Sequence, residues 1–346
     1  MKGRGAATNP ENRFSRLSQV VEHIEGVDEE NDLTRKTQLF EETPLKILSK
    51  NSSVDVPFEL SINPYQGCEH GCVYCYARNS HEYWGFSAGL DFESKIIVKK
   101  NAPALLEKAF LHKNYVPKAI ALSGNTDCYQ PTEGKLKITR GLLEVFLKYR
   151  NPVSIITKNS LIERDLDLLK KLAKLNLVHV SVSITTLEEE TRRRLEPRTV
   201  SGKKRLDVVK LLSDNGIPVN VMVAPIIPWI NHHEIPKIME RSAKAGASGA
   251  VYTVVRLNGA LAGIFSDWLV DHYPNRASRV LNTIKEMHDG QLNDSDWGKR
   301  MSGTGQVSAM IRQMFNQAKT KHFKGRSISP LDLSLFRRQG HYTLFS

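Results

Sequence analysis

The chain has 346 residues, of which 40% are hydrophobic and 25% charged, as in an ordinary globular protein with room for one large domain or two modest ones. No apolar run approaches the ~20 residues needed to span a bilayer, so we exclude a membrane-spanning segment. The first residues carry no apolar segment typical of a secretory signal, and we expect a reducing, cytoplasmic location. The formal net charge of +12 and the isoelectric point near 9.4 favour a polyanionic partner such as nucleic acid.

Residues 1–50 are polar, of mixed charge and without sustained hydrophobic periodicity. We interpret them as a tail or as an arm that wraps around the folded domain. From about residue 51 to residue 258, short β-rich runs alternate with helical segments. The β-rich runs are residues 57–62, 118–123, 153–157, 178–184, 219–224 and 250–255, and the helical segments are residues 105–111, 136–149, 161–175, 203–215 and 234–244.

This alternation predicts repeated βαβ units and a parallel sheet. Six strands are enough for a partial (β/α)6 barrel of the TIM type, and fewer than the eight of a closed barrel. We therefore expect an α/β fold with the barrel in residues 51–258 and residues 1–50 as an N-terminal arm. Residues 259–326 predict a C-terminal helical extension packed on the barrel, and residues 327–346 form a tail.

Three of the four cysteines, Cys68, Cys72 and Cys75, lie within eight residues of one another in a loop after the first predicted strand. Thiolates gathered on a loop select zinc, copper(I) or an iron–sulfur cluster. A cluster of four irons needs four ligands, so three cysteines leave one iron open to a small molecule. Zinc is the alternative, with His70 completing a Cys3His set, although no second cysteine pair follows as in most zinc sites.

Polar segments also follow the later strands. They are residues 123–130 after the second strand, 157–159 after the third, 183–186 at the end of the fourth and 225–229 after the fifth. A parallel barrel places its chemistry at the carboxyl ends of its strands, which meet at one edge of the sheet. The sequence therefore predicts one shared cleft that includes the cysteine loop.

The CxxxCxxC spacing, with an aromatic residue directly before the last cysteine, resembles the signature of the radical S-adenosylmethionine (SAM) superfamily. Residues 72–78 (CVYCYAR), 157–158 (TK), 196–199 (EPRT) and 223–226 (VAPI), with Ser183, resemble its spore photoproduct lyase branch, often described as DNA-repair-photolyase-like. Residues 4–14 and 80–93 resemble an uncharacterised bacterial subgroup. The resemblance implies a [4Fe–4S] cluster whose open iron chelates SAM, and one electron that cleaves SAM to a 5′-deoxyadenosyl radical.

The resemblance also implies roles by position. Cys68, Cys72 and Cys75 would hold the cluster, and Tyr74 would lie beside the adenine of SAM. Thr126 and Asp127 would meet the amino group of SAM, because an ammonium group in a partly dry cleft requires a carboxylate or a hydroxyl. The remaining SAM contacts would be Lys158 to the carboxylate, Ser183 to the ribose, and the pair Glu196 and Arg198 in or behind the pocket.

Two further residues are candidates for hydrogen transfer. In spore photoproduct lyase a cysteine after the second strand returns a hydrogen atom to the product radical, and Cys128 lies in the corresponding loop, shifted by a few positions. Tyr76 matches a tyrosine that the family places in the hydrogen-transfer path. Each has a packing alternative, since a buried cysteine behaves as a small hydrophobe.

The densest basic stretch comprises residues 192–194, Arg198 and residues 203–205. It predicts either a surface that tracks phosphates or the solvated starts of helices. The tail ends in Leu344-Phe345-Ser346, which resembles the short peptides that dock on bacterial sliding clamps. His232 and His233 follow the fifth strand, and we assign no metal to them.

The main hypothesis is a cytoplasmic radical SAM enzyme, lyase-like or with other radical chemistry, that acts on nucleic acid in repair or modification. Its cofactors would be a [4Fe–4S] cluster and SAM, and a protein of the flavodoxin or ferredoxin type would supply electrons. The nucleic-acid substrate rests on the branch resemblance and on positive charge. Two alternatives stay open: a non-catalytic nucleic-acid-binding protein with a metal staple, and a radical SAM enzyme acting on a small molecule or peptide.

Overall fold

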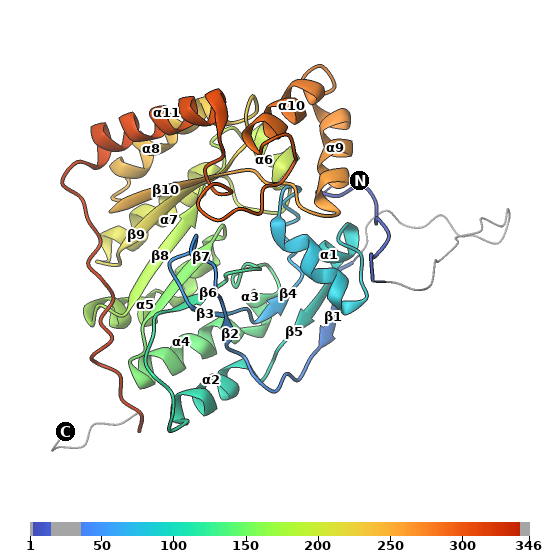
Figure 1. Ribbon diagram of the computed structural model, residues 1–346. Helices are drawn as coiled ribbons and strands as arrows, with labels where there is room; N and C mark the ends of the chain where they lie inside the picture. The colour runs from blue at the N-terminus through green and yellow to red at the C-terminus, as the bar shows by residue number, and fades with distance from the viewer. Residues whose placement is uncertain (1–2, 15–35, 340–346) are drawn as a thin grey trace, which may run out of the picture.

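The computed structural model describes residues 3–14 and 36–339 (Figure 1). Within these residues the main sheet has seven strands, in the order β10-β9-β8-β7-β6-β3-β2. Six run parallel: β3 (Leu60–Ile62), β6 (Ile120–Leu122), β7 (Val153–Thr157), β8 (Val178–Ser183), β9 (Val219–Ile226) and β10 (Gly249–Val254). β2 (Ser49–Lys50) pairs with β3 in antiparallel orientation at one edge. The predicted partial barrel of six parallel strands is confirmed.

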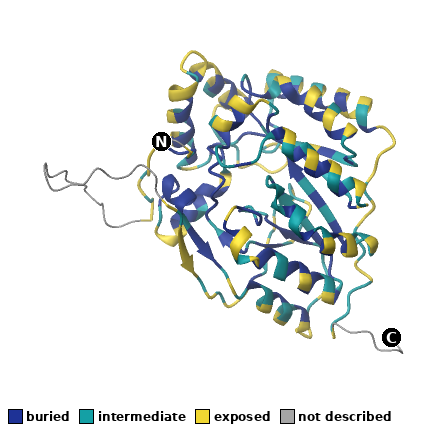
Figure 2. Cartoon of the chain, turned by 180° about the vertical axis from the view of Figure 1, so that it is seen from behind, coloured by how far each residue is buried: buried dark blue, intermediate teal, exposed yellow. Residues whose placement is uncertain are grey.

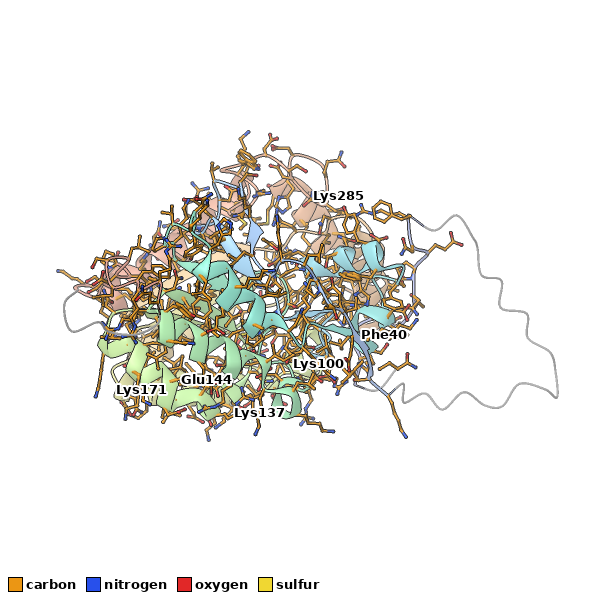
Figure 3. The ribbon with its side chains drawn as sticks, turned by 90° about the horizontal axis from the view of Figure 1, so that it is seen from below. Phe40, Lys100, Lys137, Glu144, Lys171 and Lys285 are labelled. Carbon is orange, nitrogen blue, oxygen red and sulfur yellow. The ribbon has the colours of Figure 1, made fainter. Side chains whose placement is uncertain are left out.

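Helices cover the outer face of this sheet, each with one apolar stripe turned toward it (Figures 1 and 2). In α5 (Leu166–Lys174), Leu168, Leu169 and Leu172 are buried, whereas Lys171 is exposed. Figure 3 shows Lys171 of α5 and Glu144 of α4 (Ile138–Tyr149) on the outer surface of the helical layer. The helices that follow strands are α2 (Ala102–Leu111), α4 (Ile138–Tyr149), α5 (Leu166–Lys174), α7 (Gly202–Asp214) and α8 (Ile235–Lys244), with the short α3 (Glu133–Leu136) and α6 (Glu189–Leu195) in loops.

A second, smaller sheet has the order β1-β5-β4, with β1 (Gln38–Glu41), β5 (Lys95–Val98) and β4 (Tyr65–Gln66). This second sheet could not be predicted from the sequence, because strands of two to four residues are too short to show an alternation of apolar and polar residues. β4 lies directly before the cysteine loop, and β5 follows the 3-10 helix η1 (Tyr76–Trp84) and α1 (Leu90–Ser94). The small sheet therefore fixes both ends of the segment that carries the cysteines.

Glu93 anchors the amino-terminal arm to that segment. Its carboxylate accepts hydrogen bonds from the backbone N–H groups of Gly5 and Ala6, at 3.0 and 2.8 Å, and pairs with the Arg78 guanidinium at 2.5 Å. Arg78 is fully buried and also donates to the carbonyl of Cys72 at 3.0 Å. The described parts of the arm thus pack against the cysteine segment, and Glu93 connects the two through hydrogen bonds and an ion pair.

The chain ends in a helical region and a strap. The predicted C-terminal helices are present as α9 (Leu261–His272), α10 (Ala277–Met287) and α11 (Gly305–Phe323). Residues 327–339, the strap, then cross the loops that precede β7 and β8, where the N–H of Asp332 donates to the Asn176 carbonyl at 3.0 Å. The clamp-like motif at residues 344–346 lies outside the described residues. No helix in the described part of the chain is both long and apolar enough to cross a membrane.

Candidate active site

A cavity of about 630 Å³ lies at the carboxyl ends of the parallel strands. The cysteine loop, the segments at the ends of β6 to β10, and two surface segments at residues 50–58 and 300–301 border it. The predicted site residues that line it are Cys68, Cys72, Tyr74, Cys75, Tyr76, Thr126, Asp127, Lys158 and Ser183. The shared cleft expected from the strand ends is therefore present, with the three cysteines in its wall.

Two glycines shape the cysteine loop. Gly67 and Gly71 have φ angles of +77° and +66°, which side chains with a Cβ rarely adopt. A Cβ on Gly71 would lie 2.7 Å from a carboxylate oxygen of Glu93, so the loop also needs the missing side chain for space. These turns bring Cys68 and Cys72, each 7% exposed, to the wall of the cavity as free thiols. Burial raises the pKa of both thiols, and a positive metal centre is what favours thiolates in such a setting.

His70 lies in the same loop, but its ring is already engaged. Its Nε2 is 3.0 Å from the side-chain amide of Asn159, and its Nδ1 is 3.4 Å from a carboxylate oxygen of Asp127. Burial lowers the pKa of His70 more than Asp127 raises it. With both ring nitrogens facing protein partners, His70 braces the loop and does not complete a Cys3His set. The donor set is three thiols, which fits a cluster with one open iron.

Tyr74 is supported from behind by a buried ion pair. Its hydroxyl donates to the carboxylate of Glu196, which also pairs with Arg205 and accepts from the Thr185 hydroxyl at 2.6 Å. The Glu196 and Arg205 side chains are 0% and 1% exposed. Burial alone would raise the pKa of the Glu196 carboxyl, but the charges of Arg205 and Lys158 outweigh it and lower the pKa to about 2. Glu196 therefore does not line the cavity and acts by holding Tyr74.

Lys158 and Ser183 form a polar face beside Tyr74. The ammonium of Lys158 donates to the Ser183 hydroxyl at 2.8 Å and lies 6.0 Å from the centre of the Tyr74 ring. Ser183 in turn donates to the Ala224 carbonyl at 3.1 Å. Among the described residues no carboxylate forms an ion pair with Lys158, which leaves its charge available to an anionic group in the cavity.

The Asp127 side chain has more hydrogen-bond partners than the Lys158 side chain. Its carboxylate accepts hydrogen bonds from the Thr157 hydroxyl at 2.9 Å and from the backbone N–H groups of Lys158 and Tyr129, both at 2.8 Å. The neighbouring Thr126 lines the cavity, and its hydroxyl donates to the Tyr65 carbonyl at 2.6 Å. Asp127 thus organises the loops after β6 and β7, and contact between these two residues and the amino group of SAM stays a prediction.

The profile of the radical SAM superfamily matches residues 62–242, just over half of the chain. The chain belongs to the radical SAM superfamily. Membership confirms the resemblance read from the cysteine spacing, makes the protein an enzyme, and implies SAM and an iron–sulfur cluster as its cofactors. The matched range contains the cysteine loop, Lys158, Ser183 and the Glu196–Arg205 pair.

Relatives of known sequence extend the comparison. An uncharacterized protein of Mycobacterium tuberculosis is 34% identical over 226 residues, which are 65% of this chain and 66% of that protein. The radical SAM Nalpha-GlyT isomerase of Pseudomonas phage M6 is 26% identical over 230 residues, 66% of this chain and 46% of that one. The matches thus leave a third or more of each relative's length uncovered.

Among solved structures, spore photoproduct lyase complexed with dinucleoside spore photoproduct superposes with a TM-score of 0.63. The sequence identity is 16%, over 88% of this chain and 86% of the lyase chain. At this identity the similarity concerns the fold, and it confirms that this radical SAM enzyme has the architecture of the predicted branch.

The two hydrogen-transfer candidates of this radical SAM enzyme lie in different surroundings. Tyr76 is 51% exposed, borders the cavity, and donates its hydroxyl to the Gly124 carbonyl. Cys128 is fully buried in the main core and does not line the cavity. Its placement favours the packing interpretation of Cys128 over that of a hydrogen donor, because a thiol enclosed by core side chains cannot meet a radical in the cavity.

The basic stretch near α6 is only partly a surface. Arg192 is 7% exposed and donates to the carbonyls of Glu196 and Thr199, at 3.0 and 2.8 Å, and Arg205 is buried against Glu196. These two arginines hold the EPRT turn in place and face away from solvent, so they are not part of a phosphate-tracking surface. Arg198 is 33% exposed, lies 3.6 Å from the Glu69 carboxylate, and does not line the cavity.

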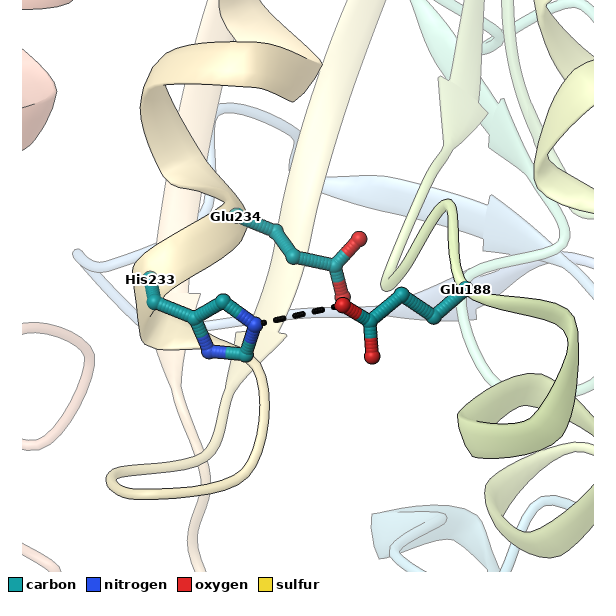
Figure 4. A group of neighbouring side chains, drawn as sticks. All are labelled: Glu188, His233 and Glu234. Atoms are coloured by element: carbon teal, nitrogen blue, oxygen red, sulfur yellow. Dashed lines mark hydrogen bonds and ion pairs between the residues drawn. The ribbon is translucent and has the colours of Figure 1, made fainter.

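A second cavity of about 610 Å³ lies between the loop after β9, α6 and the start of α10. At its edge Glu188, His233 and Glu234 come together, with the His233 ring 3.4 Å from Glu188 (Figure 4). Glu234 is already satisfied, since it accepts from the Thr186 hydroxyl and from the N–H of Leu187 at 2.7 Å. These contacts join the segment after β8 (residues 186–188) to residues 233 and 234 before α8, and we assign no metal to the group.

Three cationic residues of the main cavity were not predicted from the sequence: Lys50, Arg256 and Arg300. Arg256 follows β10 by two residues, so the rule that located the other polar segments at strand ends applies to it as well. Arg300 lies in an irregular segment after α10, and no local pattern connects that segment with the cavity.

Proposed function

We propose that this enzyme cleaves SAM reductively at a [4Fe–4S] cluster and acts on nucleic acid, in repair or in modification. One observation carries the proposal: Cys68, Cys72 and Cys75 border a single cavity, while both ring nitrogens of His70 are engaged elsewhere. Three thiolates leave one iron of a four-iron cluster without a protein ligand, and in this superfamily the amino and carboxylate groups of SAM take that position.

When bound, the cluster supplies one electron that cleaves SAM to a 5′-deoxyadenosyl radical. The chain's own residues hold and orient the cofactor. Lys158 offers a charge to the SAM carboxylate, and the Ser183 hydroxyl offers a partner to the ribose. The Tyr74 ring, fixed by Glu196, would pack beside the adenine and keep water from the reacting atoms. A protein of the flavodoxin or ferredoxin type would deliver the electron.

The nucleic-acid substrate has two supports. The chain carries a formal net charge of +12, which raises the local concentration of polyanions. The solved structure with the same fold, spore photoproduct lyase, is complexed with dinucleoside spore photoproduct. Both supports are by association, and the site itself defines only where a substrate would meet the radical.

The test is anaerobic reconstitution with iron and sulfide, followed by dithionite and SAM. Wild-type protein should be brown, bind about four irons per chain and release 5′-deoxyadenosine. Cys72→Ala should lose the iron and the 5′-deoxyadenosine. Cys128→Ala, which alters a cysteine outside the cavity, should keep about four irons and serves as the matched control. Colourless protein with one zinc per chain would instead support the metal-stapled binding protein.

A further inference from the structure

Arg256 is a partly buried cation without a hydrogen-bond or ion-pair partner in the described part of the chain. It borders the main cavity at the end of β10, and no described residue forms a hydrogen bond or ion pair with its guanidinium. The buried arginines of this chain behave differently, since Arg78 and Arg205 each pair with a carboxylate and donate to backbone carbonyls. Withdrawing a guanidinium from water without a partner costs free energy, so an unpaired one in a cavity indicates a site for an anion.

The neighbours of Arg256 are committed to other contacts. The guanidinium of Arg300 pairs with the Asp55 carboxylate and donates to the Ser53 hydroxyl. The Asp55 carboxylate also accepts from the N–H of Gly298 at 2.7 Å, so it is committed to bracing the segments at residues 51–58 and 294–303. Burial and the charge of Arg300 lower the pKa of Arg256 more than Tyr76 and the carboxylates of Asp55 and Asp294 raise it, and neither carboxylate forms an ion pair with its guanidinium.

The anion at Arg256 differs from the SAM carboxylate. Arg256 follows β10 and Lys158 follows β7, and β9 and β8 lie between these two strands in the sheet. Arg256 therefore belongs to the β10 end of the cavity, away from Lys158. The two surface segments and the end of β10 contribute the apolar residues Val56, Phe58, Val255 and Met301 to the cavity wall, together with the polar Asn51, Ser53 and Thr253. A cation beside an apolar wall matches a nucleotide, whose base is flat and largely apolar and whose phosphate is anionic.

We propose that Arg256 binds a phosphate of the substrate, next to the nucleotide that enters the cavity. The guanidinium fork donates two hydrogen bonds to phosphate oxygens, and Arg300, itself paired with Asp55, holds the neighbouring surface segments in place. This inference rests on the proposed function for the identity of the substrate as nucleic acid. Recognition of the substrate would then require one negatively charged phosphate of the nucleic-acid backbone inside the cavity, in addition to any general attraction by the basic surface of the protein.

The test measures binding of a fluorescein-labelled ten-residue oligothymidylate to the reconstituted protein by fluorescence anisotropy. Arg256→Gln should raise Kd about 10- to 100-fold, as expected for loss of charge-assisted hydrogen bonds, and Arg256→Lys should restore part of the affinity. Arg279→Gln removes an exposed arginine of the second cavity and should change Kd less than about twofold. Wild-type protein should bind the uncharged methylphosphonate version of the oligomer weakly, and Arg256→Gln should bind it no more weakly.

Several results would overturn the proposal. They are wild-type affinity in Arg256→Gln, equal losses in Arg256→Gln and Arg279→Gln, or equal affinity of the wild type for the charged and uncharged oligomers. Binding of an acidic peptide in place of the oligomer, with the same dependence on Arg256, would overturn the assignment to nucleic acid. Because the assay does not need SAM cleavage, the two proposals fail separately: absence of 5′-deoxyadenosine counts against the proposed function, and an unchanged Kd counts against Arg256.

Discussion

The buried pair of Arg205 and Glu196 offers the sharpest test of how the site is held together. Arg205→Met would remove the guanidinium and leave the Glu196 carboxylate charged in a place where its side chain is 0% exposed. It would also leave the Ser183 carbonyl without its 3.0 Å donor. Breaking a buried pair by removing one partner costs about 3–5 kcal/mol, because an uncompensated charge stays behind.

The pKa of Glu196 gives a second route to the same magnitude. In the unfolded chain a glutamate titrates near 4.5, and in the folded chain the pKa is about 2. The carboxylate therefore stabilises the fold above pH 4.5, and this stabilisation is lost as pH falls through 2. A difference of about 2.5 pKa units corresponds to roughly 3 kcal/mol, which agrees with the first route. In Arg205→Met burial would raise the pKa of Glu196 above its unfolded value, so the carboxyl would take up a proton above pH 4.5. The deficit of the variant should therefore shrink as the pH falls toward 4.5, and shrink further below it as the wild type loses its own stabilisation.

The assay is urea denaturation of the reconstituted protein under nitrogen, followed by circular dichroism at pH 7 and at lower pH. Arg205→Met should lose about 3 kcal/mol of unfolding free energy, and the double variant Arg205→Met/Glu196→Gln should recover at least a third of it. Glu196→Gln alone completes the double-mutant cycle. A loss below 1 kcal/mol in Arg205→Met, or a coupling energy near zero, would show that the pair does not hold Tyr74.

Three further changes probe other parts of the fold. Burial lowers the pKa of His81 to about 4, so the neutral ring stabilises the fold above pH 6.5. We expect the unfolding free energy, measured by urea denaturation, to fall by about 2 kcal/mol between pH 7.5 and pH 5. This fall should be absent in His81→Phe. Gly71→Ala should cost more than the ~1 kcal/mol expected from its φ angle alone and should lower bound iron, whereas Gly85→Ala, at φ +78° with no atom nearby, should cost only that backbone term. Phe336→Ala, which removes a strap ring 5.4 Å from that of Tyr115, should lower the unfolding free energy by about 1–2 kcal/mol, and the exposed Leu333→Ala should leave it unchanged.

The long βαβ repeats could be predicted because each element carries its own signal. β8 (Val178–Ser183) alternates valine with polar residues, and α5 shows leucines at helical spacing next to exposed lysines. The cluster ligands could be predicted for a similar reason, since Cys68, Cys72 and Cys75 are local in sequence. The small β1-β5-β4 sheet could not, because its strands are short and β1 meets β5 across more than fifty residues.

The contacts that support the site join residues far apart in the chain, and for this reason they could not be predicted from the sequence. Glu93 is joined to Gly5 across 88 residues, and Asp55 is joined to Arg300 across 245. Composition cannot reveal such pairs, and neither can the spacing of residues along one helix. The EPRT motif was recognised by resemblance, yet its Glu196 lies behind Tyr74 instead of in the cavity, because Arg205 and Arg192 draw the turn into the interior.

The arginines of this chain also show why net charge is a weak guide to a nucleic-acid site. Arg78, Arg192 and Arg205 add to the total of +12, yet each is buried and neutralised by a carboxylate. Their charge contributes little to attraction at a distance, since an ion pair presents almost no net field to solvent. Arg256 counts once in the same total, but its charge faces the cavity without a described partner. Specific binding should therefore depend far more on this one arginine than on an exposed arginine outside the main cavity such as Arg279, and the comparison of Arg256→Gln with Arg279→Gln measures that difference directly.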